Sequence, residues 1–213
     1  MSDIHRILRT LKETYPDTDP ESSTEDPFKT LINCILSQRT RDANAEKATN
    51  SLFNTASTPE EVLRLSQDEL EELIRSSGFY RQKARHIAET CRGLMETHGG
   101  AVPWDRESLL RLPGVGPKTA DIVLSHSFNV RTVPVDVHVW RVTRRLGLAP
   151  TDADHEEVKM ALEGIVPDDH MLLYDRAALR IGKEYCRKTE PRCGPCPLGP
   201  HCGYKASREL SVP

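Results

Sequence analysis

Apolar residues recur at a helical period along most of this chain. Between Arg81 and His98 they return every three or four positions, which places them on one face of a helix. The first helix is predicted from Ser2 to Lys12, with Ile4, Ile7, Leu8 and Leu11 on one side. A second helix is expected to open at Pro27 and to carry apolar positions from Phe28 to Leu36. Further helices are predicted at 105–111, 118–128, 137–146, 154–164 and 170–185.

Two short helices are indicated by the residues that precede them. Thr58 and Ser66 are each followed three residues later by a glutamate, and this spacing is typical of a capping box. Strand signals are nearly absent. The segment 132-TVPVDVHV-139 alternates like a strand, but it contains Pro134 and has no partner segment. The pattern therefore predicts an all-α fold with short loops.

Length and composition narrow the class of protein. With 213 residues the chain can form one domain or two small ones. It has no apolar run of the length that a bilayer requires, and its charged first 17 residues do not resemble a signal peptide. We therefore expect a cytoplasmic protein without membrane contact. The net charge is −3, yet residues 171–213 carry eight basic and four acidic side chains, so a local basic face is possible.

The six cysteines fall into two groups. Cys34 and Cys91 lie within apolar stretches and are interpreted as small buried residues. The other four have the spacing C-x6-C-x2-C-x5-C, and four thiolates suit either a tetrahedral zinc or an iron–sulfur cluster. Their positions are Cys186, Cys193, Cys196 and Cys202.

A basic loop runs between the first two cysteines of this set. It carries Arg187, Lys188 and Arg192 between Cys186 and Cys193. A run of charged residues like this one usually only faces solvent. A loop that metal ligands hold at both ends is also suited to contact phosphates.

The stretch 112-LPGVGPKTA-120 joins two predicted helices through a turn. Gly114 and Gly116 permit a close backbone approach, and the N–H groups at the start of the next helix can bind a phosphate. A plain helix connection is the alternative. Lys118 then stands at a helix start, where a cation is disfavoured. A position that disfavours the cation favours the neutral amine. A lysine forms Schiff bases in its neutral form, so this position suits an amine nucleophile.

A lone carboxylate follows 18 residues after this lysine. Asp136 lies among the valines of 133-VPVDVHV-139. It can cap the helix that starts at Val137, and it can also accept a proton from Lys118 or stabilise a sugar cation. One carboxylate can do both.

Over nearly its whole length the sequence resembles the endonuclease III family of the helix–hairpin–helix DNA glycosylases. The resemblance rests on 36-LSQRTRDANAEKAT-49, 78-GFYRQKARHI-87, 112-LPGVGPKTAD-121, 134-PVDVHVWRV-142 and the four cysteines. It implies a six-helix barrel with the hairpin at 21–130, and an iron–sulfur domain made from 1–20 and 131–213. It also implies a DNA-binding cleft between the two domains and flipping of the target nucleotide.

Carried over residue by residue, the resemblance assigns Lys118 and Asp136 to catalysis and the four cysteines to a [4Fe–4S] cluster. It implies that Phe79 and either Gln38 or Arg39 fill the duplex after flipping, because Arg39 stands where the family has its glutamine. For Phe79 the alternative is an ordinary core aromatic. The full set expected to contact DNA is Gln38, Arg39, Phe79, Gly114, Val115, Gly116, Lys118, Thr119, His138, Arg187, Lys188 and Arg192.

The implied activity is that of a bifunctional DNA glycosylase and abasic-site lyase. It would excise oxidised pyrimidines such as thymine glycol from double-stranded DNA, acting as a monomer at the nucleoid. Three alternatives remain: a thymine-mismatch glycosylase, an adenine-mismatch glycosylase, and a non-catalytic DNA-binding or redox module. Adenine-specific relatives lack a lysine at the position of Lys118, and a non-catalytic module would have lost Lys118 or Asp136.

Overall fold

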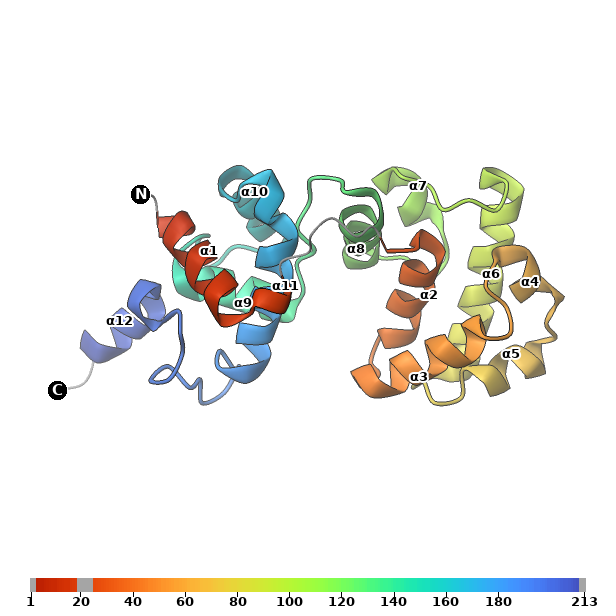
Figure 1. The fold of residues 1–213 in the computed structure, drawn as a ribbon, viewed down its shortest axis with the longest axis horizontal. Helices are drawn as coiled ribbons and strands as arrows, with labels where there is room; N and C mark the ends of the chain where they lie inside the picture. The colour runs from red at the N-terminus through yellow and green to blue at the C-terminus, as the bar shows by residue number, and fades with distance from the viewer. Residues whose placement is uncertain (1–2, 19–24, 211–213) are drawn as a thin grey trace. The chain divides into compact units, whose positions relative to one another are not determined.

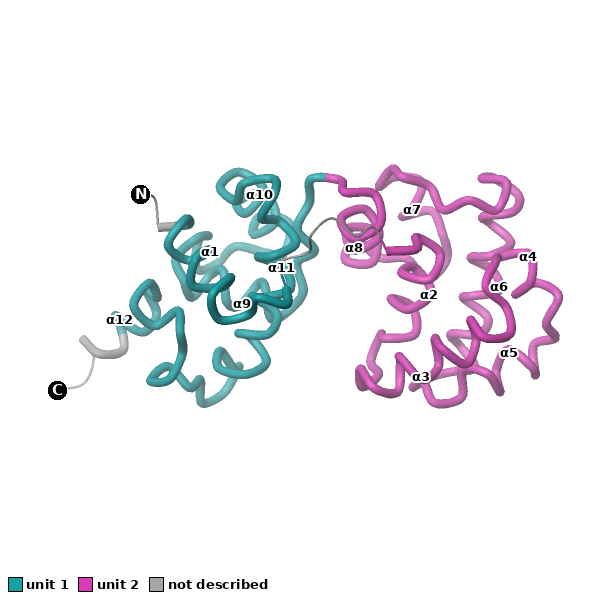
Figure 2. The backbone as a smooth tube through the Cα atoms, in the orientation of Figure 1, with its two compact units in different colours: residues 1–23, 131–213 teal, residues 24–130 magenta. Residues whose placement is uncertain are grey.

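A computed structural model describes residues 3–18 and 25–210 of the chain. The chain divides into two compact units, residues 24–130 and residues 1–23 with 131–213 (Figure 2). The assignment of these units as a hairpin domain and a cluster domain stays a prediction. Every regular element within the described ranges is helical, so 132–139 is not a strand (Figure 1). None of the described helices has the length and apolar character needed to cross a bilayer.

The unit of residues 24–130 is built from consecutive helices around one apolar core. Its core side chains include Leu31, Ile35, Ile87 and Leu94, all fully buried. The helices are α2 (Pro27–Ser37), α3 (Asp42–Phe53), α4 (Pro59–Arg64), α5 (Gln67–Leu73), α6 (Tyr80–His98), α7 (Arg106–Arg111) and α8 (Pro117–Phe128). Helices α4 and α5 both pack against α6, and α2 packs against α3 and α8.

Side-chain caps set several of these helix starts. Thr58 and Ser66 form the capping boxes that the sequence predicted, with Glu61 and Glu69 as reciprocal partners. Asp26 caps α2 through a 2.6 Å hydrogen bond from the backbone N–H of Lys29, and Pro27 follows at the first helical position. These local signals explain why the sequence located the helix starts well.

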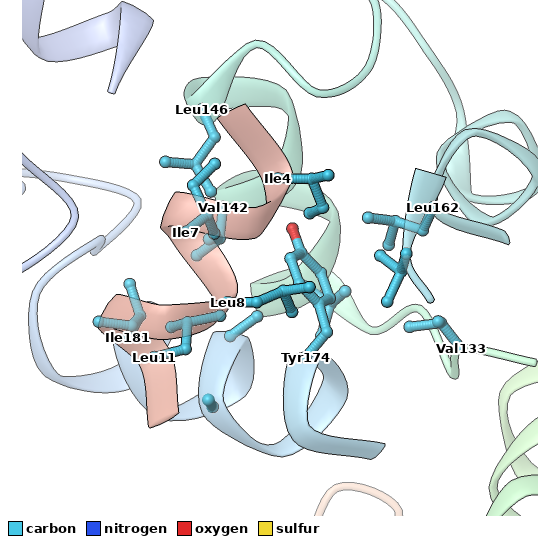
Figure 3. Packing of buried hydrophobic residues seen from close by; sticks show 14 of the residues in the cluster. Ile4, Ile7, Leu8, Leu11, Val133, Val142, Leu146, Leu162, Tyr174 and Ile181 are labelled. Carbon is cyan, nitrogen blue, oxygen red and sulfur yellow. The ribbon is translucent and has the colours of Figure 1, made fainter. Parts of the chain in front are cut away.

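The other unit joins the two ends of the chain. Its helices are α1 (Asp3–Thr14), α9 (Val137–Leu146), α10 (His155–Ile165), α11 (Met171–Glu184) and α12 (Gly203–Leu210), with short 3₁₀ turns at Pro16–Thr18, Asp168–His170 and Gly199–His201. The apolar stripe of α1 packs against α11, and α9 contributes side chains to the same core (Figure 3). Buried Tyr174 donates to or accepts from Thr143 at 2.8 Å within this core.

The sequence-based helix assignment was incomplete at two places. Helix α3 was not predicted, because its buried face consists of Ala45, Ala48, Thr49 and Leu52, a weak apolar signal. Helix α12 follows the last cysteine and was also missed. The predicted cap Ser2 lies outside the described residues.

Candidate functional site

The turn between α7 and α8 requires glycine at Gly114. Its φ is +77°, and a Cβ there would approach the side chain of His86 to 3.3 Å. Thr90 Oγ1 donates to the carbonyl of Pro113 at 2.6 Å, and Gln38 Nε2 donates to the carbonyl of Gly114 at 3.1 Å. The turn is therefore anchored from α6 and from the end of α2.

Two backbone donors of this turn are available for a ligand. The N–H groups of Gly114 and Gly116 make no hydrogen bond within the described part of the chain. Gly116 is the N-cap of α8, and a Cβ built on it would meet nothing within 4 Å. Unused N–H groups at a helix start with open space beside them suit an anion such as a phosphate.

Lys118 is exposed in the first turn of α8, directly after these donors. Val115 and Thr119, which were also expected to contact DNA, are only 8% and 6% exposed. Any contact that these two residues make must therefore use the backbone. The turn thus presents one reactive side chain beside a set of backbone N–H groups.

Asp136 is the N-cap of α9, as one of its two predicted roles requires. Its Oδ1 accepts from the backbone N–H groups of His138 and Val139, each at 2.8 Å. His138 itself lies against α11 at Gly182, where a Cβ would come within 2.6 Å of the histidine Cβ. Asp136 belongs to the unit of both chain ends and Lys118 to the other unit.

The three residues expected to fill the duplex lie in two loops of the same unit. Gln38 and Arg39 follow α2 and are exposed, and Phe79 precedes α6 and is 60% exposed. The interpretation of Phe79 as a core aromatic is therefore wrong. Arg39 and Phe79 both have positive φ, +50° and +58°, a conformation rarely adopted by side chains of this size.

A buried lysine connects these two loops, and the sequence did not single it out. Lys83 is 5% exposed, and four oxygens share the three N–H donors of its ammonium at Nζ–O distances of 2.6 to 2.9 Å: Leu36 O, Gln38 O, Thr40 Oγ1 and Ser77 Oγ. Burial lowers the pKa of Lys83 to about 8. The available signal was its place four residues before Ile87, on the apolar face of α6.

The four clustered cysteines share one cavity. Cys186, Cys193, Cys196 and Cys202 are all half-buried around it, together with Arg145 and Tyr204. Burial raises the pKa of the Cys196 and Cys202 thiols, while backbone N–H groups that donate to these sulfurs act in the opposite direction. No group of three or more Cys, His, Asp or Glu in the described ranges is close enough for a single metal ion.

Arginines of α9 fasten the loop that starts at the first of these cysteines. Arg141 Nε donates to the carbonyl of Cys186 at 2.6 Å, and Arg145 Nη1 donates to that of Arg187 at 2.8 Å. The side chains of Arg187, Lys188 and Arg192 are exposed and form no ion pair with a described residue. The backbone of the loop is held in place while its charges face solvent.

The predicted buried cysteines also lie where expected. Cys34 is 8% exposed and Cys91 is fully buried. Burial raises the pKa of the Cys91 thiol to about 12, which makes it unreactive at neutral pH. Both residues are buried side chains of the unit of residues 24–130.

Comparison with known proteins gives consistent matches over nearly the whole chain. The family model of HhH-GPD superfamily base excision DNA repair proteins matches residues 32–168. Endonuclease III of Thermotoga maritima is 40% identical over 205 residues, covering 96% of this chain and 94% of that protein.

Two solved structures are also similar. A trapped covalent intermediate of endonuclease III with DNA has a TM-score of 0.85 and 36% identity, covering 98% of this chain and 99% of that one. A thermostable thymine-DNA glycosylase has a TM-score of 0.86 and 25% identity, covering 96% and 97%. The chain therefore belongs to the HhH-GPD superfamily of base excision DNA repair proteins and, within it, to the endonuclease III family.

Proposed function

We propose that Lys118 is the nucleophile of a bifunctional DNA glycosylase and abasic-site lyase. The chain is an enzyme of base excision repair with both activities, as its membership in the endonuclease III family implies. The observation that carries the assignment is the position of Lys118, exposed in the first turn of α8 beside the unused N–H groups of Gly114 and Gly116. These groups would hold the phosphate of the nucleotide that the lysine attacks.

The chemistry follows from an amine beside a sugar. The neutral Nζ of Lys118 attacks C1′ and the glycosidic bond breaks; the base leaves with the bonding electron pair and takes up the proton that Nζ loses. The C1′–O4′ bond then breaks, O4′ takes up a proton from solvent, and a protonated Schiff base forms between Nζ and C1′. Loss of a C2′ proton then expels the 3′ phosphate by β-elimination and cuts the strand.

Asp136 supplies the carboxylate of this scheme. Its Oδ1 is fixed by two backbone donors of α9, so the group is oriented before DNA binds. It would accept the proton that Lys118 releases or stabilise positive charge on the sugar. The proposal requires that both residues reach the same nucleotide in the complex with DNA.

The four cysteines would hold a [4Fe–4S] cluster. All four thiols line one cavity, and donors at the sulfurs are typical of iron–sulfur sites. Bound there, the cluster would tie the chain between Cys186 and Cys202 into a fixed loop. Arg187, Lys188 and Arg192 would then contact DNA phosphates.

Borohydride trapping tests the central assignment. With an oligonucleotide duplex that contains an abasic site, the wild-type protein should give a covalent adduct, and Lys118→Gln should not, while its DNA affinity stays similar. Lys47→Gln is the matched control, because Lys47 is an exposed lysine of the same unit on α3. Adduct formation by Lys118→Gln at the wild-type rate would assign the nucleophile to another amine.

The preferred lesion is a second part of the proposal. We expect oxidised pyrimidines such as thymine glycol in double-stranded DNA. The similarity to a thymine-DNA glycosylase keeps a T·G mismatch as the competing substrate. A panel of thymine glycol, uracil, T·G, A·8-oxoguanine and abasic duplexes distinguishes these possibilities. Excision of adenine opposite 8-oxoguanine, or no excision at all, would favour the adenine-specific or the non-catalytic alternative.

The protein is expected to act as a monomer on nucleoid DNA in the cytoplasm. Sedimentation of the free protein and of its complex with a short duplex tests this stoichiometry. A 2:1 complex on a duplex with one lesion would contradict it.

A further inference from the structure

We propose that Lys83 is a positioning residue that fixes both loops expected to enter the duplex. This inference rests on the proposed function, since it assigns a support to Gln38, Arg39 and Phe79. Lys83 lies in the first turns of α6, and its ammonium contacts both of these loops.

Lys83 makes two contacts with the first loop, residues 37–41, and one with the end of α2 directly before it. Nζ donates to the carbonyl of Leu36 at 2.7 Å, to that of Gln38 at 2.6 Å and to Thr40 Oγ1 at 2.8 Å. The carbonyl of Leu36 belongs to the last turn of α2, where a cation is favourable. These contacts bracket Arg39, the residue with positive φ in this loop.

The second loop is joined to the first at the same point. Lys83 Nζ also donates to Ser77 Oγ at 2.9 Å, and the N–H of Gly78 donates to Thr40 Oγ1 at 3.0 Å. Gly78 is itself tightly placed, since a Cβ there would come within 3.1 Å of the carbonyl oxygen of Arg39. Phe79 follows directly, so the contacts of Ser77 and Gly78 fix where its backbone begins.

The charge of Lys83 is unusual for a buried side chain. No carboxylate among the described residues pairs with it, and all its partners are carbonyl or hydroxyl oxygens. A buried charge without a counter-ion is costly, and an apolar side chain at this position would avoid that cost. An ammonium at this position stabilises the fold only because it donates to several acceptors from separate segments and so holds those segments together.

The first loop also contacts the turn between α7 and α8. Gln38 Nε2 donates to the carbonyl of Gly114 at 3.1 Å, so the first loop contacts the turn that precedes Lys118. Two segments expected to contact DNA thus meet at one buried lysine, and a third is joined to them through Gln38, all within a single unit. Loss of the ammonium should loosen the loops while the nucleophile stays intact.

The test compares Lys83→Met with wild type on two substrates. Excision of thymine glycol from a duplex should fall by about ten-fold or more, the effect of losing hydrogen bonds from a charged donor. Cleavage of an abasic site in a single strand, which needs no duplex filling, should stay within about two-fold of wild type. Lys83→Arg should restore part of the loss because it keeps the charge and the donors.

Hydrogen exchange gives a readout that does not depend on activity. The amides of Thr40 and Gly78 should exchange faster in Lys83→Met, whereas those of α8 should not change. Lys159→Met is the matched control, since it removes another buried lysine, 8% exposed, from the other unit. Equal losses on both substrates, or unchanged exchange at Thr40 and Gly78, would overturn the positioning role. If wild type cuts neither substrate, the proposed function fails, while the exchange result still decides the role of Lys83.

Discussion

The two units hold the loops proposed to contact DNA by different means. In the unit of residues 24–130, the loops at 37–41 and 77–79 are fastened by hydrogen bonds to one buried lysine, Lys83. In the other unit, the loop from Cys186 is fastened by Arg141 and Arg145 of α9 and carries the cysteines proposed to bind metal. The first unit can therefore set its loops from protein groups alone. The second is expected to depend on the proposed cluster.

This contrast is sharpest for the two proposed catalytic residues, Lys118 and Asp136, one in each unit. Asp136→Asn should lower base excision by about 10³-fold or more, because the charged carboxylate is lost. Asparagine still caps a helix, so the unfolding free energy should change little, whereas Asp136→Ala should lose about 1 kcal/mol in addition. Single-turnover excision and thermal unfolding measure the two effects. Equal excision by Asp136→Asn and wild type would remove Asp136 from the mechanism.

Loss of the proposed cluster should destabilise the unit that contains the four cysteines and leave the unit of residues 24–130 nearly unchanged. Cys202→Ser should lose the visible absorbance of the cluster and raise hydrogen exchange in α9 and α12. Exchange in α2 and α6 should change little, because their core contains none of the four cysteines. Cys34→Ala, a buried cysteine of the other unit, should keep the absorbance. A parallel rise in exchange throughout the chain would show that the first unit also depends on the cluster.

Phe79 tests whether the exposed loops act on the duplex. Phe79→Ala should lower excision of a paired lesion by roughly ten- to a hundred-fold, the range expected from about 1–3 kcal/mol of lost stacking. Because Phe79 is 60% exposed, the melting temperature should hardly change. Trp104→Ala, an aromatic of the same unit with 73% exposure, is the control and should retain activity. An equal loss of cleavage at single-stranded abasic sites would argue against the duplex-filling role.

The pH dependence of Lys83 should move stability and function in opposite directions. Its pKa is lowered by burial from 10.5 to about 8, so between these values the unfolded chain binds a proton that the folded chain does not. The contribution of Lys83 to stability therefore rises with pH across this window. The neutral amine has fewer donors, so excision of a paired lesion relative to single-stranded abasic-site cleavage should fall above pH 8. Lys83→Met should show neither trend, and a wild-type ratio that stays constant through this range would contradict the account.

The loop cations should have the smallest effect at low salt. Replacing Arg187, Lys188 and Arg192 by alanine should reduce the slope of log affinity against log salt by about 0.9 for each phosphate that the variant no longer binds. Fluorescence titration of a labelled duplex at several salt concentrations measures the slope. Arg64→Ala and Arg75→Ala, which remove cations from surface ion pairs of the other unit, should leave it unchanged. An unchanged slope in the triple variant would mean that the loop is only solvated.

Local signals in the sequence predicted most of this fold. Helices with a wide apolar face or a capping residue were located, including the cap of α9 at Asp136. Helix α3 was missed because alanines make up much of its buried face. Lys83 was missed for a different reason, since its partners Leu36, Thr40 and Ser77 are backbone or hydroxyl oxygens, two of them distant in sequence. No residue pattern reports hydrogen bonds of that kind.

The contribution of α1 to the core of the discontinuous unit has a consequence during synthesis. The stripe of Ile4, Ile7, Leu8 and Leu11 is buried in a core that α11 covers, and α11 ends at Glu184. Ribosomes add about 5–20 residues per second, so roughly ten to thirty seconds pass between the synthesis of α1 and the completion of α11. In that interval the helices of residues 24–130 are already complete and can fold. Helix α1 is thus made well before the segment that buries it, and its apolar face stays exposed on the nascent chain until α11 has been synthesised.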